Sequence, residues 1–115
     1  MDSDRPDLDL AAIHTTLEAE LAEITMASEA AAGERKPVTL DQQSVGRLSR
    51  MDALQVQAMA NAVEGRRQGR EARIKTALKR LDEGEYGTCI TCGDDIPAER
   101  LELDATTARC VGCSA

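Results

Sequence analysis

The chain has 115 residues and a formal net charge of −7, with one aromatic residue, Tyr86, and neither tryptophan nor phenylalanine. So few large side chains cannot fill a thick globular core, which favours long paired helices and a segment closed by a metal. The acidic balance argues against general binding to nucleic acid, because phosphate contacts require a dense basic surface.

The first ten residues, MDSDRPDLDL, are acidic and hold no apolar run, so they do not have the character of a signal peptide. No later run reaches the length of a membrane span. We therefore expect a cytoplasmic protein that makes no use of a membrane and whose cysteines stay reduced. Residues 1–7 are charged and contain Pro6, which predicts a flexible tail.

The next segment, from about Leu8 to Ala32, has the apolar spacing of a helix that pairs with another helix. The stripe recurs every seven residues, and a second position completes the seam. Its members are Leu10, Leu17, Ile24 and Ala31, with Ile13 and Leu21 at the second position. Gly33 and Pro37 then predict a break, since glycine ends helices readily and proline disfavours their continuation.

A second and longer helix is predicted to run to about Glu83. It begins at a capping box formed by Thr39 and Gln42. Its apolar side comprises Val45, Leu48, Val56, Met59, Val63, Ile74, Leu78 and Leu81. Gly65 and Gly69 weaken it by about 1 kcal/mol each relative to alanine, which predicts a bend or a softer stretch. The predicted architecture is a mainly α fold: an antiparallel coiled-coil hairpin over residues 8–83, turning at about 33–39, followed by a zinc finger over 84–115.

Four cysteines form two pairs with two residues inside each pair and seventeen residues between the pairs: Cys89, Cys92, Cys110 and Cys113. Each pair can present both thiolates to one ion from a tight turn, and two pairs complete a tetrahedral zinc site with Zn–S distances of about 2.3 Å. Because sulfur fills all four positions, no place is left for a catalytic water. We expect one structural Zn²⁺ and no enzymatic activity; two disulfides or a redox pair are the competing interpretations.

The segment Gly84-Glu85-Tyr86-Gly87-Thr88-Cys89-Ile90-Thr91-Cys92-Gly93 resembles the signature G-x-[YF]-G-x-C-x-x-C-G of the DksA/TraR bacterial transcription regulators. The resemblance continues through Ile96 and Arg100-Leu101 to the second cysteine pair. It implies a coiled-coil hairpin joined to a four-cysteine zinc finger. It also implies direct binding to RNA polymerase, with insertion of the hairpin into the secondary channel and altered stability of the open complex, often together with guanosine tetraphosphate. No DNA sequence would be read.

The resemblance also implies an acidic residue at the tip of the hairpin, where the family pattern reads D-x-x-D-x-A. One register places the tip at Asp41, with Ser44 in the position of the second acid, and a rival register places it at Asp52, followed by Ala53. A third interpretation is that both are ordinary helix acids. Asp41 also suits the first turn of a helix, where the helix dipole favours negative charge.

A basic run in the second helix is the candidate contact with the alarmone or the polymerase. Counted back from Cys89, Arg66 and Arg73 match basic alarmone contacts of the family, and Arg70 lies between them. Residues seven apart share one helix face, and arginines suit phosphate groups. A solvated basic face, or pairing with the acidic first helix, explains the same run equally well.

Two other functional classes remain open from the sequence. A zinc-dependent nucleic-acid-binding module is opposed by the acidic finger and the lack of aromatic residues for base stacking. A dimeric scaffold would use the seam of the first helix between two chains, whereas a channel-inserting regulator is expected to be a monomer when active.

Overall fold

The structure is a computed structural model of the whole chain, and it describes residues 5–35 and 47–114. Its elements are α1 (Leu10–Ala30), the 3₁₀ helix η1 (Ala32–Arg35), α2 (Arg47–Glu83) and α3 (Ala98–Leu103). Within the described residues the only β structure is an isolated antiparallel bridge between Thr88 and Asp95. The predicted mainly α fold class is confirmed. None of the helices in these ranges is long and apolar enough to cross a membrane.

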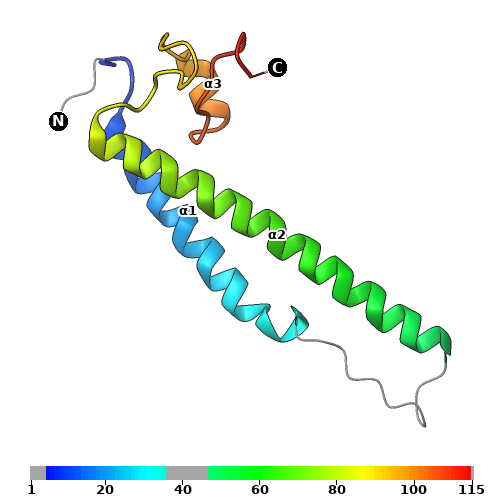
Figure 1. Cartoon of the computed structure of the whole chain (residues 1–115). Coiled ribbons are helices and arrows are strands. Elements are labelled where there is room, and N and C mark those ends of the chain that lie inside the picture. The colour runs from blue at the N-terminus through cyan, green and yellow to red at the C-terminus, as the bar shows by residue number, and fades with distance from the viewer. Residues whose placement is uncertain (1–4, 36–46, 115) are drawn as a thin grey trace. The chain divides into compact units, whose positions relative to one another are not determined.

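The chain divides into two compact units, and each of the two long helices contributes residues to both units. The first unit comprises Met1–Ala22 and Glu71–Ala115, and the second comprises Glu23–Arg70. This division differs from the predicted one, in which the hairpin and the finger were separate. The reason is that the finger packs on the start of α1 and the end of α2, so these parts form one unit (Figure 1).

In the first unit, the start of α1 lies beside the end of α2, and the two run in opposite directions (Figure 1). Leu17 of α1 is 1% exposed, and Ile74 of α2 is fully buried. At the same level, His14 lies between Glu18 of its own helix and Asp82 of α2, with its Nδ1 3.0 Å and its Nε2 3.9 Å from a carboxylate oxygen. Leu17, one of the predicted heptad positions, is therefore buried where α1 lies beside α2.

In the second unit, the end of α1 pairs with the middle of α2 through a polar contact. The Ser28 hydroxyl donates to Oε2 of Glu64 at 3.1 Å, and Glu64 is only 7% exposed. This contact brings together residues 36 positions apart, as an antiparallel helical hairpin requires. A buried polar pair of this kind can fix the register of two helices.

The predicted apolar side of the second helix is wrong at two positions, because Val56 and Met59 are each 63% exposed. Ser28 meets Glu64, and α1 ends two residues later at Ala30, so residues well before Glu64 extend past the end of α1. Val45 and the capping box at Thr39 and Gln42 lie outside the described residues, as does most of the predicted turn. Through Gly65 and Gly69, α2 is an unbroken helix.

The ends of the long helices are set by local capping. The Asp9 carboxylate accepts the amide of Ala12 at 3.1 Å, which explains why α1 begins at Leu10 rather than at Leu8. At the other end, Gly84 has a φ of 74°, and the amides of Gly84 and Glu85 donate to the carbonyls of Leu81 and Arg80. This is a Schellman motif, and it ends α2 just before the finger.

Residues 5–7 differ from the predicted flexible tail. Arg5 is 6% exposed and donates from Nη1 to the carbonyl oxygen of Gly87 at 2.8 Å, a contact between residues 82 positions apart. A buried guanidinium needs an acceptor and an opposite charge, and the finger backbone and Asp7 supply them.

Candidate zinc centre

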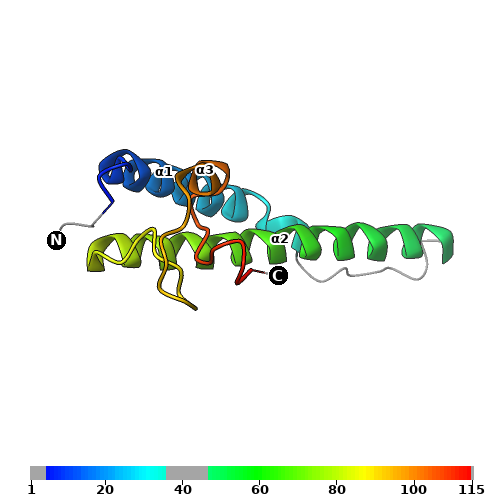
Figure 2. The same cartoon turned by 90° about the horizontal axis from the view of Figure 1, so that it is seen from above.

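The finger is an irregular chain around one short helix. Residues 84–97 and 104–114 carry few regular elements, and α3 lies between them (Figure 2). A small core holds the segment together: Tyr86, Cys89, Ile96 and Leu101 are each no more than 3% exposed. So small a core is insufficient for independent folding, which is the circumstance in which a structural metal contributes most.

The first cysteine pair sits on a tight turn. The amide of Gly93 donates to the carbonyl of Cys89 at 3.0 Å, and the amide of Cys89 donates to the carbonyl of Asp94 at 2.8 Å. Gly93 has a φ of 80°, a conformation that is costly for residues with a Cβ. The turn brings the thiols of Cys89 and Cys92 to one side.

The second pair repeats this arrangement with Cys110 and Cys113. The amides of Cys113 and Ser114 both donate to the carbonyl of Cys110 at 3.1 Å. The two turns are joined by the amide of Ile90, which donates to the carbonyl of Ala108 at 2.9 Å. The backbone therefore holds the two cysteine pairs against each other.

The four predicted cysteines come together as one cluster. Their Sγ atoms all lie within 4.8 Å of one another, and those of Cys92 and Cys110 are 3.7 Å apart. A tetrahedral zinc with Zn–S bonds of about 2.3 Å requires sulfur atoms about 3.8 Å apart. The four thiol side chains and the distances between their sulfur atoms thus fit a zinc ion bound by four thiolates. The predicted zinc is confirmed, and its chemistry is structural, since four sulfurs complete the coordination shell.

The thiols do not titrate alike. Hydrogen bonds from backbone amides, first that of Cys110 and then that of Cys92, lower the pKa of Cys89 to about 5. The neighbouring sulfurs, Cys110 first, raise the pKa of Cys113 to about 12. The neighbouring sulfurs therefore oppose deprotonation of Cys113, and a bound dication offsets that repulsion.

Two arginines that the sequence analysis did not select reach the backbone just before Cys89. Arg5 donates to the carbonyl of Gly87, and Arg80 donates from Nη2 to the carbonyls of Glu85, at 2.9 Å, and of Thr88. The role of Arg80 could have been predicted from its position in the last turn of a helix, where basic side chains reach the terminal carbonyls. For Arg5, within a charged and proline-containing start, no such signal was present.

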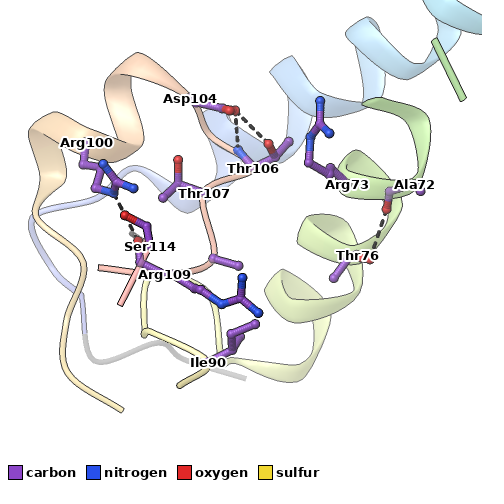
Figure 3. Close-up of a pocket in the computed structure, with 11 residues that line it drawn as sticks. Ala72, Arg73, Thr76, Ile90, Arg100, Asp104, Thr106, Thr107, Arg109 and Ser114 are labelled. Atoms are coloured by element: carbon purple, nitrogen blue, oxygen red, sulfur yellow. Dashed lines mark hydrogen bonds between the residues drawn. The ribbon is translucent and has the colours of Figure 1, made fainter. Parts of the chain in front are cut away.

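The first unit also contains a cavity of about 450 Å³ between the end of α2 and the finger. Figure 3 shows Arg73 and Thr76 on α2, across from Arg109 and Thr107 of the finger. Arg100 also lines it and donates from Nε to the carbonyl of Arg109 at 3.1 Å. Asp104 also lines the cavity, so three arginines against one carboxylate give its lining a net positive charge.

The other predicted site residues are separate from this cavity. Arg66 is exposed and Arg70 is half-buried, and both belong to the second unit. Asp52 is exposed and Ala53 is half-buried near the start of α2. Asp41 and Ser44 lie outside the described residues. The structure thus brings the four cysteines together and places Arg73 in the lining of a cavity. The roles of the acids proposed for the tip remain predictions.

Comparison with known proteins agrees with this description. Residues 84–115 match the prokaryotic dksA/traR C4-type zinc finger. The RNA polymerase-binding transcription factor DksA of Haemophilus influenzae is 39% identical over 41 residues, which cover 36% of this chain and 28% of that relative. The matched segment thus spans little more than a quarter of the curated relative.

The fold has a counterpart among solved structures. The transcription factor DksA2 from Pseudomonas aeruginosa superimposes with a TM-score of 0.71 at 20% identity, covering 90% of this chain and 78% of that one. At this identity the likeness is one of fold. Zinc finger, cysteine geometry and helical fold agree with one another: residues 84–115 are similar to the dksA/traR C4-type zinc finger, and the fold is similar to that of DksA2.

Proposed function

We propose that this chain is a non-enzymatic regulator of transcription that binds RNA polymerase directly. The observation that carries the proposal is the finger, which matches the prokaryotic dksA/traR C4-type zinc finger. The chain is also 39% identical over 41 residues to a relative named as an RNA polymerase-binding transcription factor. Such a function requires the protein in the cytoplasm, the compartment that the sequence predicts.

Residues 51–59 in the first half of α2 support a protein partner rather than a nucleic acid, since they include no lysine, arginine or aromatic residue. Four apolar side chains in its first half are between 48% and 63% exposed: Met51, Leu54, Val56 and Met59. Exposed apolar side chains that gather on one element are typical of protein-binding surfaces. A nucleic-acid-binding surface would instead offer rows of arginine and lysine, with aromatic residues for stacking.

The mode of action that we propose is insertion of the hairpin into the secondary channel of the polymerase, which alters the stability of the open complex. The length of α2 supports it, since 37 residues of continuous helix correspond to about 55 Å. In this proposal the zinc finger fixes the end of α2, and an acidic residue near the hairpin turn, Asp41 or Asp52, acts at the far end.

Guanosine tetraphosphate is the proposed small-molecule partner, and Arg73 is its proposed contact. Arg73 is exposed and lines the basic cavity together with Arg100 and Arg109. Guanidinium groups are the side chains best suited to hold phosphate groups by paired hydrogen bonds. Arg66 and Arg70 belong to the second unit and remain predicted contacts of the alarmone or the polymerase.

Binding to purified core RNA polymerase tests the proposed function. Zinc-loaded protein should be retained by immobilised polymerase, and Cys92→Ser, which lacks one zinc ligand, should be retained less because its finger is unfolded. Plain duplex DNA in a gel-shift assay is the control for the nucleic-acid alternative, and sedimentation distinguishes a monomer from a dimeric scaffold. Retention by DNA but not by polymerase would refute the proposal.

A further inference from the structure

The first residues that the structure describes form a built contact with the finger. The Arg5 guanidinium binds both carboxylate oxygens of Asp7, from Nε at 3.0 Å and from Nη2 at 2.9 Å. Its remaining terminal nitrogen donates to the carbonyl of Gly87. The amide of Leu8 donates back to the carbonyl of Arg5 at 3.1 Å, which closes a turn. We call residues 5–8 the N-terminal strap.

The strap fits closely against the finger backbone. Gly87 has a φ of 90°, and a Cβ built there would lie 3.1 Å from Nη1 of Arg5 and 3.2 Å from Cδ1 of Leu8. At these distances a methyl group at this position would require Arg5 and Leu8 to move by a few tenths of an ångström. Gly87 therefore permits the close approach as well as the turn.

The acceptor of Arg5 is part of the framework that shapes the first cysteine turn. The carbonyl of Gly87 also accepts the amide of Ile96 at 2.8 Å, beyond the turn that holds Cys89 and Cys92. Arg80 binds the next carbonyl, that of Thr88. Two guanidinium groups thus hold consecutive carbonyls directly before the first zinc ligand, one from the strap and one from α2.

The contact between Arg5 and the Gly87 carbonyl forms only when the cysteine turn is folded. Any ligand that stabilises the folded turn therefore also stabilises this contact. Zinc binding and folding are one process in small metal domains. A linkage of this kind is reciprocal: if zinc favours the seated strap, the seated strap raises the affinity for zinc by the same factor.

We propose that the N-terminal strap is a metal-dependent latch, in which Arg5 and Arg80 are positioning residues for the zinc centre and loss of zinc releases residues 5–8 from the finger. The latch stands on contacts within the first unit alone. It does not depend on binding to polymerase, and a failure of either proposal leaves the other intact.

Hydrogen exchange of the Leu8 amide, measured by NMR on the full chain, reports the seated strap. The zinc-loaded protein should show at least tenfold slower exchange at Leu8 than the same protein after zinc has been removed by a chelator. The amide of Leu21, in the middle of α1, is the internal reference and separates release of the strap from general unfolding.

Zinc affinity, measured by competition with a chromogenic chelator, tests the reciprocal effect. Arg5→Ala should weaken zinc binding about tenfold, within the range that loss of an outer-shell partner costs. Arg5→Lys, which keeps one donor, should recover part of it. Lys79→Ala removes the same charge from an exposed position next to Arg80 and should leave the affinity unchanged.

Two results would overturn the latch: Leu8 exchange that does not depend on zinc, or zinc affinity of Arg5→Ala within twofold of the unmodified chain. Should Arg5→Ala fail to fold, Asp7→Asn weakens the same guanidinium contact from an exposed position. It should then reduce zinc affinity about threefold, and an unchanged affinity in that variant would refute the proposal equally.

Discussion

The Tyr86 hydroxyl donates a hydrogen bond to the carbonyl oxygen of Ala105 at 2.7 Å, joining the chain before the first cysteine pair to the chain before the second. Tyr86 is the only aromatic residue and is 2% exposed. Its ring fills the small core of the finger, while its hydroxyl closes the loop between the two cysteine turns. One side chain thus contributes both packing and a long-range hydrogen bond.

Tyr86→Phe should lower the free energy of unfolding of the zinc-loaded finger by about 1 kcal/mol, because only the hydrogen bond is lost. Tyr86→Ala should cost about 3 to 5 kcal/mol, because the ring is lost as well and leaves a cavity. Thermal unfolding at fixed zinc concentration measures both. An equal loss in the two variants would show that the ring packing contributes nothing.

The same residue predicts an alkaline limit to stability. Burial raises the pKa of Tyr86 to about 12 from its ordinary value of 10.0, so the folded state favours the neutral phenol. Its contribution is complete below pH 10 and is lost as the pH rises from 10 to 12. Unfolding measured across this window should be less pH-dependent in Tyr86→Phe, and an identical pH profile would contradict this account.

Gly87 and Gly93 offer a matched pair of substitutions, since both have positive φ, 90° and 80° respectively. A Cβ at Gly93 would meet nothing within 4 Å, whereas one at Gly87 would meet Arg5 and Leu8. Gly93→Ala should cost about 1 to 2 kcal/mol from backbone strain alone. Gly87→Ala should cost more in a denaturant titration, and equal costs would mean that the strap yields without resistance.

The contact between Ser28 and Glu64 should contribute to pairing of α1 with α2. Ser28→Ala removes a donor from a carboxylate that is only 7% exposed, and it should lower the free energy of unfolding by about 1 kcal/mol. Thr15→Ala is the control, because that exposed hydroxyl bonds only within its own helix. Circular dichroism during urea unfolding measures the difference, and equal stability of the two variants would contradict the assigned role.

The basic cavity predicts that Arg73 contributes to the effect of guanosine tetraphosphate. Arg73→Ala should weaken the alarmone-dependent part of the transcriptional effect about tenfold, the loss expected for one charged hydrogen-bonding partner. Lys79→Ala, an exposed lysine on α2 outside the cavity lining, should not change it. Titration of the alarmone in a defined transcription reaction measures both, and equal responses would exclude the cavity as its site.

Much of the fold could be predicted from the sequence because its determinants are local. The spacing of the cysteines defines two turns and one tetrahedron, and the heptad spacing of Leu10, Leu17 and Ile24 defines one helix face. The start of α1 was predicted two residues early because the cap at Asp9 outweighs the apolar Leu8. The exposure of Val56 and Met59 depends on where the partner helix ends, which apolar periodicity does not reveal.

The strap and the two arginines before Cys89 could not be predicted for a different reason. Arg5 contacts a residue 82 positions away, and its acceptor is a backbone carbonyl, which every residue possesses. No residue type marks such an acceptor in a sequence. The carbonyl of Gly87 can accept a hydrogen bond from the buried Arg5 guanidinium only in the folded finger, where the absence of a Cβ at Gly87 allows the close approach.

The proposal that the hairpin end of this chain enters the polymerase secondary channel is tested most directly by localised radical cleavage. Fe²⁺ replaces the catalytic metal of core RNA polymerase and cuts nearby protein chains. The account predicts cuts between residues 36 and 53, in the segment that holds Asp41 and Asp52, and no cuts in residues 84–115. Cuts in the finger alone, or none at protein concentrations that saturate the polymerase, would contradict it.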